Sequence, residues 1–265
     1  MKSIILLMLS CFSVSTIAND YFIDLRKPVS NLREDVEIRI NKHRGFAKWS
    51  KAALDFSQKS LTKEEENVIN AYTRDIYDPV NTYLRDPNEF LNKYPVGIAN
   101  VKKLITDLNS GVRKLPVYKG KVFRATSIRT DLVQKLKTGD IVVDPGFFST
   151  SFLPETAKNY FESTWSEEGR TKVLLEIKVN HSAAPLVLDH ANDSEILILN
   201  STPLKIAHME KIDGIDYLAL ETVDNLKGFK GSIYNFYNGE PMQVTEITKP
   251  LVEQAGGVHN VYKVI

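Results

Sequence analysis

The stretch Asp144-Pro145-Gly146-Phe147-Phe148-Ser149-Thr150-Ser151 decides how the rest of the chain is interpreted. It follows the apolar, β-branched run Ile141-Val142-Val143, which predicts a strand that leads into a turn. Proline and glycine supply the turn residues, and two aromatic and three hydroxyl side chains follow. Aromatic rings fill a core, whereas small hydroxyl groups form hydrogen bonds without bulk. The stretch therefore indicates a strand between a core and a polar ligand, although an ordinary edge strand has the same pattern.

The composition excludes several classes of protein. The chain has 265 residues and a formal net charge of +1 at pH 7, with no basic tract that would favour nucleic-acid binding. Its five histidines lack metal-ligand spacing, and no Gly-x-Gly-x-x-Gly or Walker-type loop occurs. We therefore expect no metal site and no Rossmann-type dinucleotide site.

The first residues are typical of a secretory signal peptide. Lys2 precedes the apolar run Ile4–Leu9, and small residues follow up to Ala18. This run is too short to span a bilayer, so cleavage after Ala18 is favoured over a membrane anchor. We expect a secreted chain without stable membrane insertion, and without cysteine because Cys11 is removed with residues 1–18.

Residues 20–109 carry the signals of helices, including apolar residues at helical spacing in 30–42 and 46–56. Thr62 and Glu65 form a capping box, and Pro79 is expected to kink or end the helix that follows. Asp86-Pro87 begins another helix. Gly111 is expected just past the end of a further one.

The periodicity changes after residue 116. Strands are expected at 117–124, 141–143, 171–179, 186–188, 195–199, 205–209 and 217–222, with helices at 130–137 and 154–161. Helices first and strands later predict an α+β fold. No repeat or low-complexity linker divides residues 19–222, which we interpret as one domain. Residues 223–265 form a C-terminal extension of uncertain role, with strand-like pieces at 242–247 and 260–265.

Two further places could carry chemistry. Arg124 ends an expected strand, and its guanidinium group could bind a phosphate bidentately, although a surface arginine is the alternative. Asp193 and Glu195 are two apart at the start of another strand, which points both carboxylates to one face. For an isolated Asp-x-Glu, a solvated pair is the ordinary interpretation.

The chain resembles the arginine–serine–glutamate class of mono-ADP-ribosyltransferases. The resemblance lies in the order of three expected strands, which carry Arg124, Ser149-Thr150-Ser151 and Asp193-x-Glu195. Secreted bacterial toxins of this class are the most similar, and the resemblance covers about Leu61 to Thr222. Supporting matches are Asp144-x-Gly146-Phe147-x-Ser149-Thr150-Ser151, Ala157-x-x-x-Phe161 and Tyr72-Thr73-x-x-x-Tyr77-x-x-x-Asn81-x-x-Leu84-Arg85.

The resemblance implies a fold and a division of roles. N-terminal helices would pack on a mixed β core of two small sheets with a central NAD-binding cleft. Arg124 would bind the NAD pyrophosphate, and Ser149 would position the nicotinamide-side ribose and the catalytic glutamate. Glu195 would be that glutamate and would stabilise the positive charge that develops as the nicotinamide bond breaks.

The resemblance also implies weaker cofactor contacts. Members of the class have an aromatic residue after Ser-Thr-Ser that packs on nicotinamide. Phe161 is the candidate, with packing of its own helix as the alternative. Tyr72 and Asn81 are further candidates for NAD binding, and Tyr72 could instead be a core residue. NAD would be a substrate, and no metal is implied.

One position departs from the class. Arginine-modifying members carry Glu where this chain has Asp193, and asparagine-modifying members carry Gln. The retained charge favours arginine on a host protein as the acceptor. The shorter side chain leaves NAD glycohydrolase activity open as an alternative, and a catalytically silent interaction domain is the other.

The expected partner is a host protein substrate. Actin is the candidate, because the helix from Tyr72 to Arg85 resembles that of the actin-modifying members. We expect the chain to act as a monomer.

Overall fold

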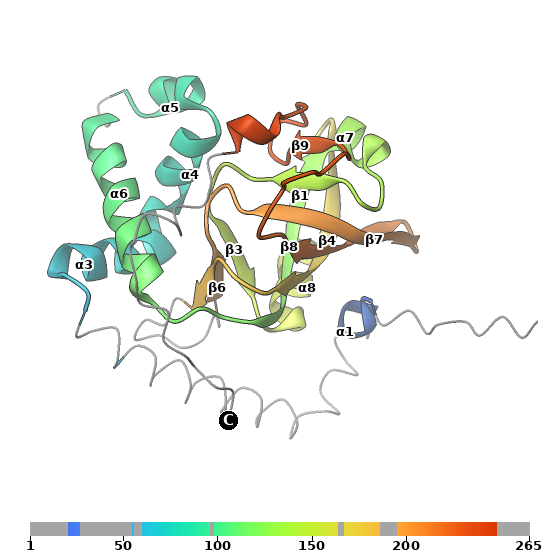
Figure 1. Cartoon of the computed structure of the whole chain (residues 1–265), viewed down its shortest axis with the longest axis horizontal. Coiled ribbons are helices and arrows are strands. Elements are labelled where there is room, and N and C mark those ends of the chain that lie inside the picture. The colour runs from blue at the N-terminus through green and yellow to red at the C-terminus, as the bar shows by residue number, and fades with distance from the viewer. Residues whose placement is uncertain are drawn as a thin grey trace, which may run out of the picture.

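The computed structural model describes residues 21–26, 55, 60–95, 98–163, 167–185 and 195–247. They form a layer of N-terminal helices beside a curled mixed β-sheet (Figure 1). The predicted α+β fold is confirmed. The predicted signal peptide, the helices expected at 30–42 and 46–56 apart from Asp55, and residues 248–265 lie outside the described residues.

The helical layer contains α3 (Lys63–Ala71), α4 (Tyr77–Arg85), α5 (Pro87–Lys93) and α6 (Ile98–Lys114). Helix α3 begins with the predicted capping box. The Thr62 hydroxyl accepts a hydrogen bond from the Glu65 N–H (3.2 Å), and the Glu65 carboxylate accepts one from the Thr62 N–H (2.8 Å). At the start of α5, the Asp86 carboxylate accepts hydrogen bonds from the Asn88 and Glu89 N–H groups, with Pro87 at the first helical position.

A π-helical turn, η2 (Tyr72–Ile76), separates α3 from α4. Pro79 lies in the first turn of α4, where a backbone N–H has no partner within the helix and its loss costs little. The interruption that Pro79 predicts therefore occurs just before the proline. A π turn adds one residue to a helical turn. It therefore resets which side chains of α4 face the sheet.

Gly111 does not end a helix, so that prediction was wrong. It lies inside α6, which continues to Lys114. A Cβ at this position would lie 2.9 Å from Ile69 Cδ1 and 3.1 Å from Glu65 Cβ. The glycine therefore allows α6 to approach α3 closely, a role that local sequence does not reveal.

The strands are β1 (Gly120–Arg129), β2 (Ile141–Val143), β3 (Phe148–Ser151), β4 (Arg170–Val179), β5 (Ala183–Pro185), β6 (Glu195–Ile198), β7 (Pro203–Ile212), β8 (Ile215–Thr222) and β9 (Ile233–Asn235). Their order in the sheet is β5-β6-β3-β1-β4-β8-β7-β2-β9. The strand expected at 117–124 begins later and runs further, so Arg124 lies in the middle of β1 rather than at its end.

The sheet has a narrow joint between β3 and β1. All of β1, from Gly120 to Arg129, pairs with β4, whereas β1 and β3 meet at the single pair Phe123 and Ser151. The strands β5, β6 and β3 therefore form one part of the sheet, and the other strands form a second part. The two small sheets expected from the family resemblance correspond to these parts of one hydrogen-bonded sheet.

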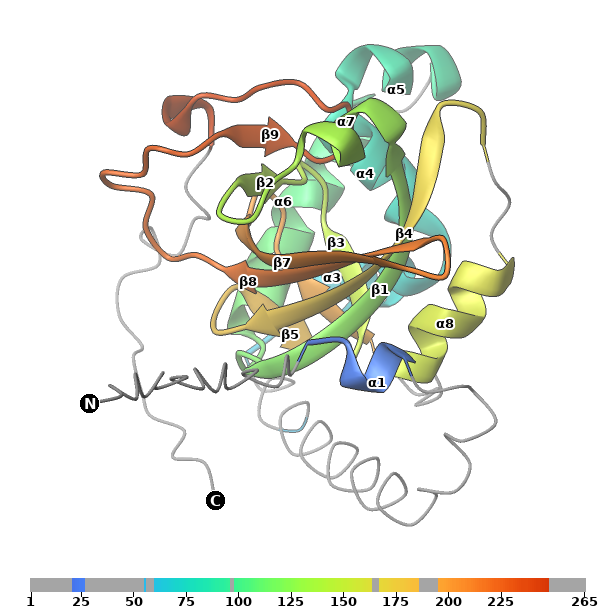
Figure 2. The ribbon, with the colours of Figure 1, turned by 90° about the vertical axis from the view of Figure 1, so that its right-hand side faces the viewer.

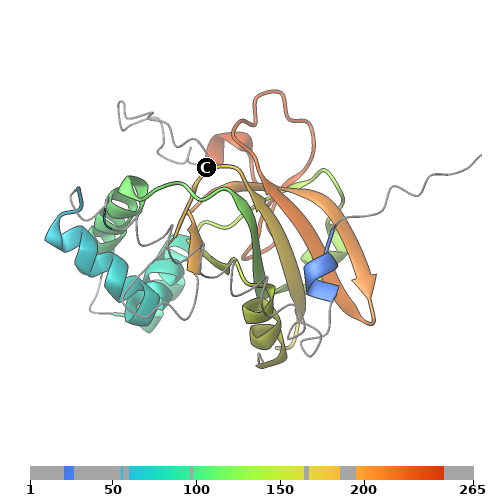
Figure 3. The ribbon, with the colours of Figure 1, turned by 90° about the horizontal axis from the view of Figure 1, so that it is seen from below.

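Alternation along the strands sorts apolar side chains into separate cores. Phe148, Ile196 and Ile198 face an inner core shared with β1, β4 and β8. Leu197 faces the opposite way and packs against the helical layer. A third cluster forms on the outer face of β1 and β4. The helices α1 (Ile23–Arg26) and α8 (Pro154–Ser163) lie on this side of the sheet (Figures 2 and 3).

Part of the expected C-terminal extension belongs to the sheet. Strand β9 pairs in parallel with β2, and Phe236 packs in the inner core. The prediction of a strand at 242–247 was wrong, because Val244–Glu246 forms a short 3-10 helix, η3. Between β1 and β2, α7 (Thr130–Lys135) confirms the predicted helix.

Candidate active site

The three motif strands lie side by side at the narrow joint of the sheet. Ser151 of β3 is paired with Glu195 of β6 on one side and with Phe123 of β1 on the other. Arg124 is the next residue along β1. A carboxylate, a row of hydroxyl groups and a guanidinium group that are far apart in sequence therefore come from three adjacent strands.

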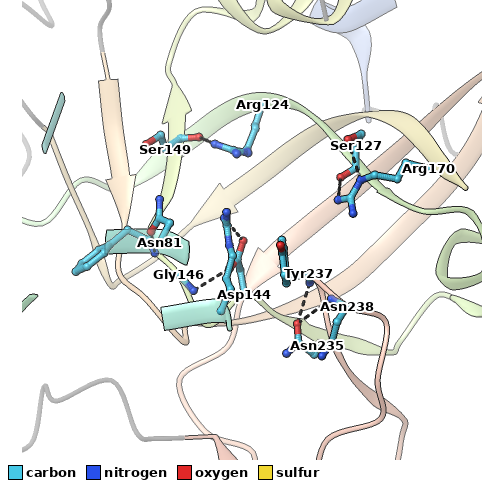
Figure 4. A network of polar contacts seen from close by, with 12 residues as sticks. Asn81, Arg124, Ser127, Asp144, Gly146, Ser149, Arg170, Asn235, Tyr237 and Asn238 are labelled. Atoms are coloured by element: carbon cyan, nitrogen blue, oxygen red, sulfur yellow. Dashed lines mark hydrogen bonds and ion pairs between the residues drawn. The ribbon is translucent and has the colours of Figure 1, made fainter. Parts of the chain in front are cut away.

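Arg124 contacts the centre of the Ser149-Thr150-Ser151 strand. Its Nη1 donates to the Ser149 carbonyl oxygen (Figure 4). Its Cζ lies 4.4 Å from the centroid of the Phe148 ring. Alternation turns Arg124 to the face opposite Phe123, and it turns Phe148 to the face opposite Ser149. Arg124 thus lies on the ring and reaches the strand backbone beside the Ser149 side chain.

The electrostatic surroundings of Arg124 favour an anion. Burial lowers the pKa of Arg124, and the nearby guanidinium group of Arg85 lowers it further. Arginine nevertheless stays charged in proteins. Its Nε is shielded from solvent and has no hydrogen-bond partner within the described part of the chain. A buried, charged donor without a partner is costly unless a ligand satisfies it, and phosphate oxygens fit that need.

Tyr72 lies at the centre of the candidate site. Its side chain is fully buried, its hydroxyl accepts a hydrogen bond from Asn81 Nδ2 (2.9 Å), and its ring packs edge-on against Phe147 at 5.6 Å. Burial raises the pKa of Tyr72 to about 12. The Asn81 and Ser149 hydrogen bonds and the charge of Arg124 oppose this shift, and the charge of Glu195 adds to it.

Ser149 forms a hydrogen bond with this phenol, and Glu195 and Arg124 lie within electrostatic range of it, in agreement with the pairing of their three strands. A fully buried ring offers no face to a cofactor, so the structure favours the interpretation of Tyr72 as a core residue. Its hydroxyl forms hydrogen bonds with Asn81 and Ser149 and so links helix α4 to the Ser149 strand.

Side chains of helix α4 bind the turn that precedes β3. Asn81 Oδ1 accepts a hydrogen bond from the Phe147 N–H (2.8 Å), and Arg85 forms a bidentate ion pair with Asp144 (2.9 and 2.7 Å). Asp144 also accepts from the Gly146 N–H (2.8 Å). A Cβ at Gly146 would lie 2.9 Å from Asn81 Oδ1, so only glycine fits beneath the helix. Asn81 therefore positions the Ser149 strand, and both of its side-chain polar atoms are engaged.

The pair of Arg85 and Asp144 was missed as part of the site. Two local signals could have suggested it. Asn81 and Arg85 are four apart and share one face of a helix. Asp144 stands two residues before a glycine, the spacing of a side chain that caps a turn. Neither signal identifies the partner, which lies 59 residues away.

Phe161 does not join this cluster. It packs against the outer core of Phe123 and Ala157, and Lys172 Nζ lies 4.4 Å from the centroid of its ring. The structure therefore favours its alternative role in packing α8. The preceding residue, Tyr160, is 60% exposed and lies within electrostatic range of Arg124. Tyr160 is thus an exposed aromatic beside the site that sequence reasoning missed.

Asp193 lies outside the described residues. Within the ranges that the structure covers, no group of three or more histidine, cysteine or carboxylate residues could hold a metal ion. Over the same ranges, no helix has the length and apolarity needed to cross a bilayer.

Comparison with known families explains this arrangement. A family model described as "ADP-ribosyltransferase exoenzyme" matches residues 46–227. The chain belongs to this family. The matched range contains Arg124, Ser149 and Glu195, and it ends before β9. The family resemblance inferred from the order of the motif strands is confirmed.

Among the relatives of this ADP-ribosyltransferase exoenzyme is Vis of Vibrio splendidus (strain 12B01), named as a candidate NAD(+)–arginine ADP-ribosyltransferase. The two chains are 30% identical over 249 residues, which covers 92% of this chain and 97% of Vis. A solved structure of the Vis toxin superposes with a TM-score of 0.72 at 27% identity, over 84% of this chain and 100% of that one. A structure of Vis with agmatine superposes with a TM-score of 0.66 at 29% identity, over 77% of this chain and 93% of that one.

Proposed function

We propose that this chain is an exported mono-ADP-ribosyltransferase that transfers ADP-ribose from NAD to an arginine of a host protein and releases nicotinamide. The observation that carries the proposal is the convergence of Arg124, Ser149 and Glu195 around Tyr72. The relationship to Vis supports the choice of arginine, because agmatine, bound in a Vis structure, carries the guanidinium group of arginine. Actin is the proposed target.

Binding of NAD and cleavage of its nicotinamide bond would fall to residues on opposite sides of the joint between β1 and β3. Arg124 is charged, its Nε has no hydrogen-bond partner among the residues that the structure describes, and it would bind the pyrophosphate of NAD. Glu195, at the start of β6, would stabilise the oxocarbenium character of the ribose as the bond to nicotinamide breaks. The bonding electron pair leaves with nicotinamide, and a guanidinium nitrogen of the target attacks the same ribose carbon.

Ser149 lies on the strand between those of Arg124 and Glu195, and it would keep these two charged groups in position. Its hydroxyl is linked to the phenol of Tyr72, and its carbonyl oxygen is held by Arg124. Asp193 is proposed to bind the guanidinium group of the target and to accept the proton that this group loses on attack.

Substitution of Glu195 by glutamine tests the proposal, because it removes the charge and keeps the shape. We expect nicotinamide release from NAD, with agmatine as acceptor, to fall by about 100- to 1,000-fold. The measurement is initial-rate release of nicotinamide, together with labelling of host-cell lysate by isotope-labelled NAD.

The matched control is Glu64→Gln, an exposed carboxylate on α3, which should leave both activities unchanged. The proposal fails if the wild-type chain labels nothing and releases no nicotinamide, or if Glu195→Gln is as active as wild type. Release that never responds to agmatine or lysate would support the glycohydrolase alternative.

A further inference from the structure

The segment Ser232–Met242 follows the family-matched region and returns to the candidate site. Strand β9 pairs with β2, and this pairing is extended by hydrogen bonds from Ile141 N–H to the Ser232 carbonyl (2.9 Å) and from Phe236 N–H to the Val143 carbonyl (2.8 Å). The side chain of Asn235 then accepts from the Tyr237 N–H (2.9 Å) and the Asn238 N–H (3.3 Å). The turn that carries Tyr237 is therefore tightly held (Figure 4).

Tyr237 joins the C-terminal segment to the helical layer. Its ring lies under Arg85, with Cζ 5.3 Å from the ring centroid, and its hydroxyl donates to Glu89 Oε2 (2.8 Å). Burial raises the pKa of Tyr237, and the hydrogen bond to Glu89 raises it further. The hydroxyl therefore stays a donor at neutral pH. Arg85 belongs to α4 and Glu89 to α5, so one side chain spans both helices.

The contact with Tyr237 acts on the turn before β3 through Arg85. Burial is the largest single effect and opposes the charged form of Arg85, but the ion pair and hydrogen bond with Asp144, together with the nearby Tyr72 and Tyr237, outweigh burial and raise the pKa of Arg85. Asp144 in turn holds the Gly146 N–H. Contacts thus run without a gap from the Tyr237 ring, through Arg85 and Asp144, to the turn that leads into Ser149.

The residue before Tyr237 supports the second arginine of the site. Phe236 is buried and packs edge-on against Phe148 at 5.9 Å. Phe148 carries the guanidinium group of Arg124 on its ring. Of two consecutive aromatic residues beyond the family-matched region, Tyr237 therefore contacts Arg85 directly, and Phe236 supports Arg124 through Phe148.

We propose that Tyr237 is a positioning residue for NAD binding, which fixes the Arg85 guanidinium group and, through Asp144, the turn that aligns the Ser149 strand with Arg124. This rests on the proposed function. The ion pair with Asp144 restrains Arg85 from one side, and the face of the Tyr237 ring restrains it from another.

Steady-state kinetics of Tyr237→Leu and Tyr237→Phe test the proposal. Because a cation–aromatic contact is removed, Tyr237→Leu should raise the KM for NAD by about 3- to 30-fold, with kcat changed by less than about threefold. Tyr237→Phe keeps the ring and should restore most of the wild-type KM. The control Val244→Ala changes an exposed residue of η3, the short helix that follows this segment, and should leave KM unchanged.

A double-mutant cycle with Arg85→Lys separates positioning from general stability. If Tyr237 acts through Arg85, adding Tyr237→Leu to Arg85→Lys should raise the KM by less than about twofold. The proposal is overturned if the KM increases of the two single substitutions multiply fully in the double variant. It is also overturned if the melting temperature of Tyr237→Leu falls while its KM stays at the wild-type value.

Amide hydrogen exchange separates failure of this proposal from failure of the proposed function. If the wild-type chain does not turn over NAD, the function fails, but positioning is still measured at the Gly146 and Phe147 amides. We expect both to exchange at least tenfold faster in Tyr237→Leu and at the wild-type rate in Val244→Ala. Exchange at the wild-type rate in Tyr237→Leu would overturn the positioning role.

Discussion

At the scale of single residues, Arg124 has the most demanding surroundings of the described site. It stacks on Phe148, donates to the Ser149 carbonyl and keeps a buried Nε without a hydrogen-bond partner among the described residues. Lysine cannot reproduce these features, because it lacks both the planar group that stacks on a ring and the fork of donors.

Arg124→Lys should therefore weaken NAD binding and spare the fold. We expect the KM for NAD to rise by at least tenfold, whereas the free energy of unfolding changes by less than about 1 kcal/mol, since a buried unpaired donor is removed. Steady-state kinetics and urea denaturation measure the two quantities. Arg129→Lys, an exposed residue of the same strand that pairs with Asp131, is the control. An unchanged KM would contradict the assignment of Arg124 to the phosphates.

The three motif stretches could be recognised in the sequence because each is tied to a local pattern. Ser149 follows a turn signal, and Glu195 opens an apolar strand, so their order along the chain was enough. The supporting residues could not be predicted, because Arg85 and Tyr237 act through partners that are distant in sequence. Phe161 was predicted to contact NAD from its place after Ser-Thr-Ser, but helical periodicity turns it toward the outer core.

At the scale of elements, α3 and α6 are joined by a buried carboxylate. Glu65 is 5% exposed, accepts hydrogen bonds from the Thr62 N–H and from the Ser110 hydroxyl, and forms an ion pair with Lys114 at 2.7 Å. Burial alone would raise its pKa. The hydrogen bonds and the ion pair outweigh burial, so the pKa of Glu65 is lowered below its ordinary value of 4.5.

A lowered pKa in the folded state means that Glu65 contributes stability above pH 4.5, and that this contribution is lost as pH falls through the folded-state pKa. Glu65→Gln should cost about 1–3 kcal/mol at pH 7 and should lose less stability than wild type on acidification below pH 4.5. Urea denaturation at a series of pH values measures both effects. Glu64→Gln, exposed one residue earlier, should follow the wild-type curve, and a parallel curve for Glu65→Gln would contradict the assignment.

Elements were predictable where their signals are local. The capping box and the Asp86-Pro87 start were confirmed because caps involve residues three positions apart or fewer. Gly111 was misread, because its reason is the approach of another helix. The order of the strands follows from long-range pairing, so the sequence alone did not determine it.

At the scale of the whole molecule, the beginning of the described chain covers the outer face of the sheet. The N–H of Phe22 donates to the buried Glu176 carboxylate of β4 (2.9 Å), and the Phe22 ring is fully buried beside Tyr217 at 5.4 Å. Glu176 also pairs with Lys121 at 3.0 Å. A residue near the N-terminus is therefore a core residue of the folded domain.

Phe22→Ala should destabilise the whole domain by about 3–5 kcal/mol, because it removes a fully buried aromatic ring and leaves a cavity. Ile23→Ala, at a side chain that is 48% exposed, should change the free energy of unfolding by less than about 0.5 kcal/mol. Urea denaturation of the chain from Asn19 onward compares the two. A loss below about 1 kcal/mol for Phe22→Ala would show that this segment is not part of the core.

Because β1 and β3 meet only at the pair of Phe123 and Ser151, the sheet can bend between these two strands with the smallest loss of backbone hydrogen bonds. A shift of β1 against β4 would break a ladder along the entire strand, whereas a change of angle between β3 and β1 strains one pair. Arg124 and Glu195 lie on opposite sides of that pair. A dinucleotide bound to both residues would bridge the joint between β1 and β3. The substrate itself would then restrict bending of the sheet where the fewest backbone pairs hold it.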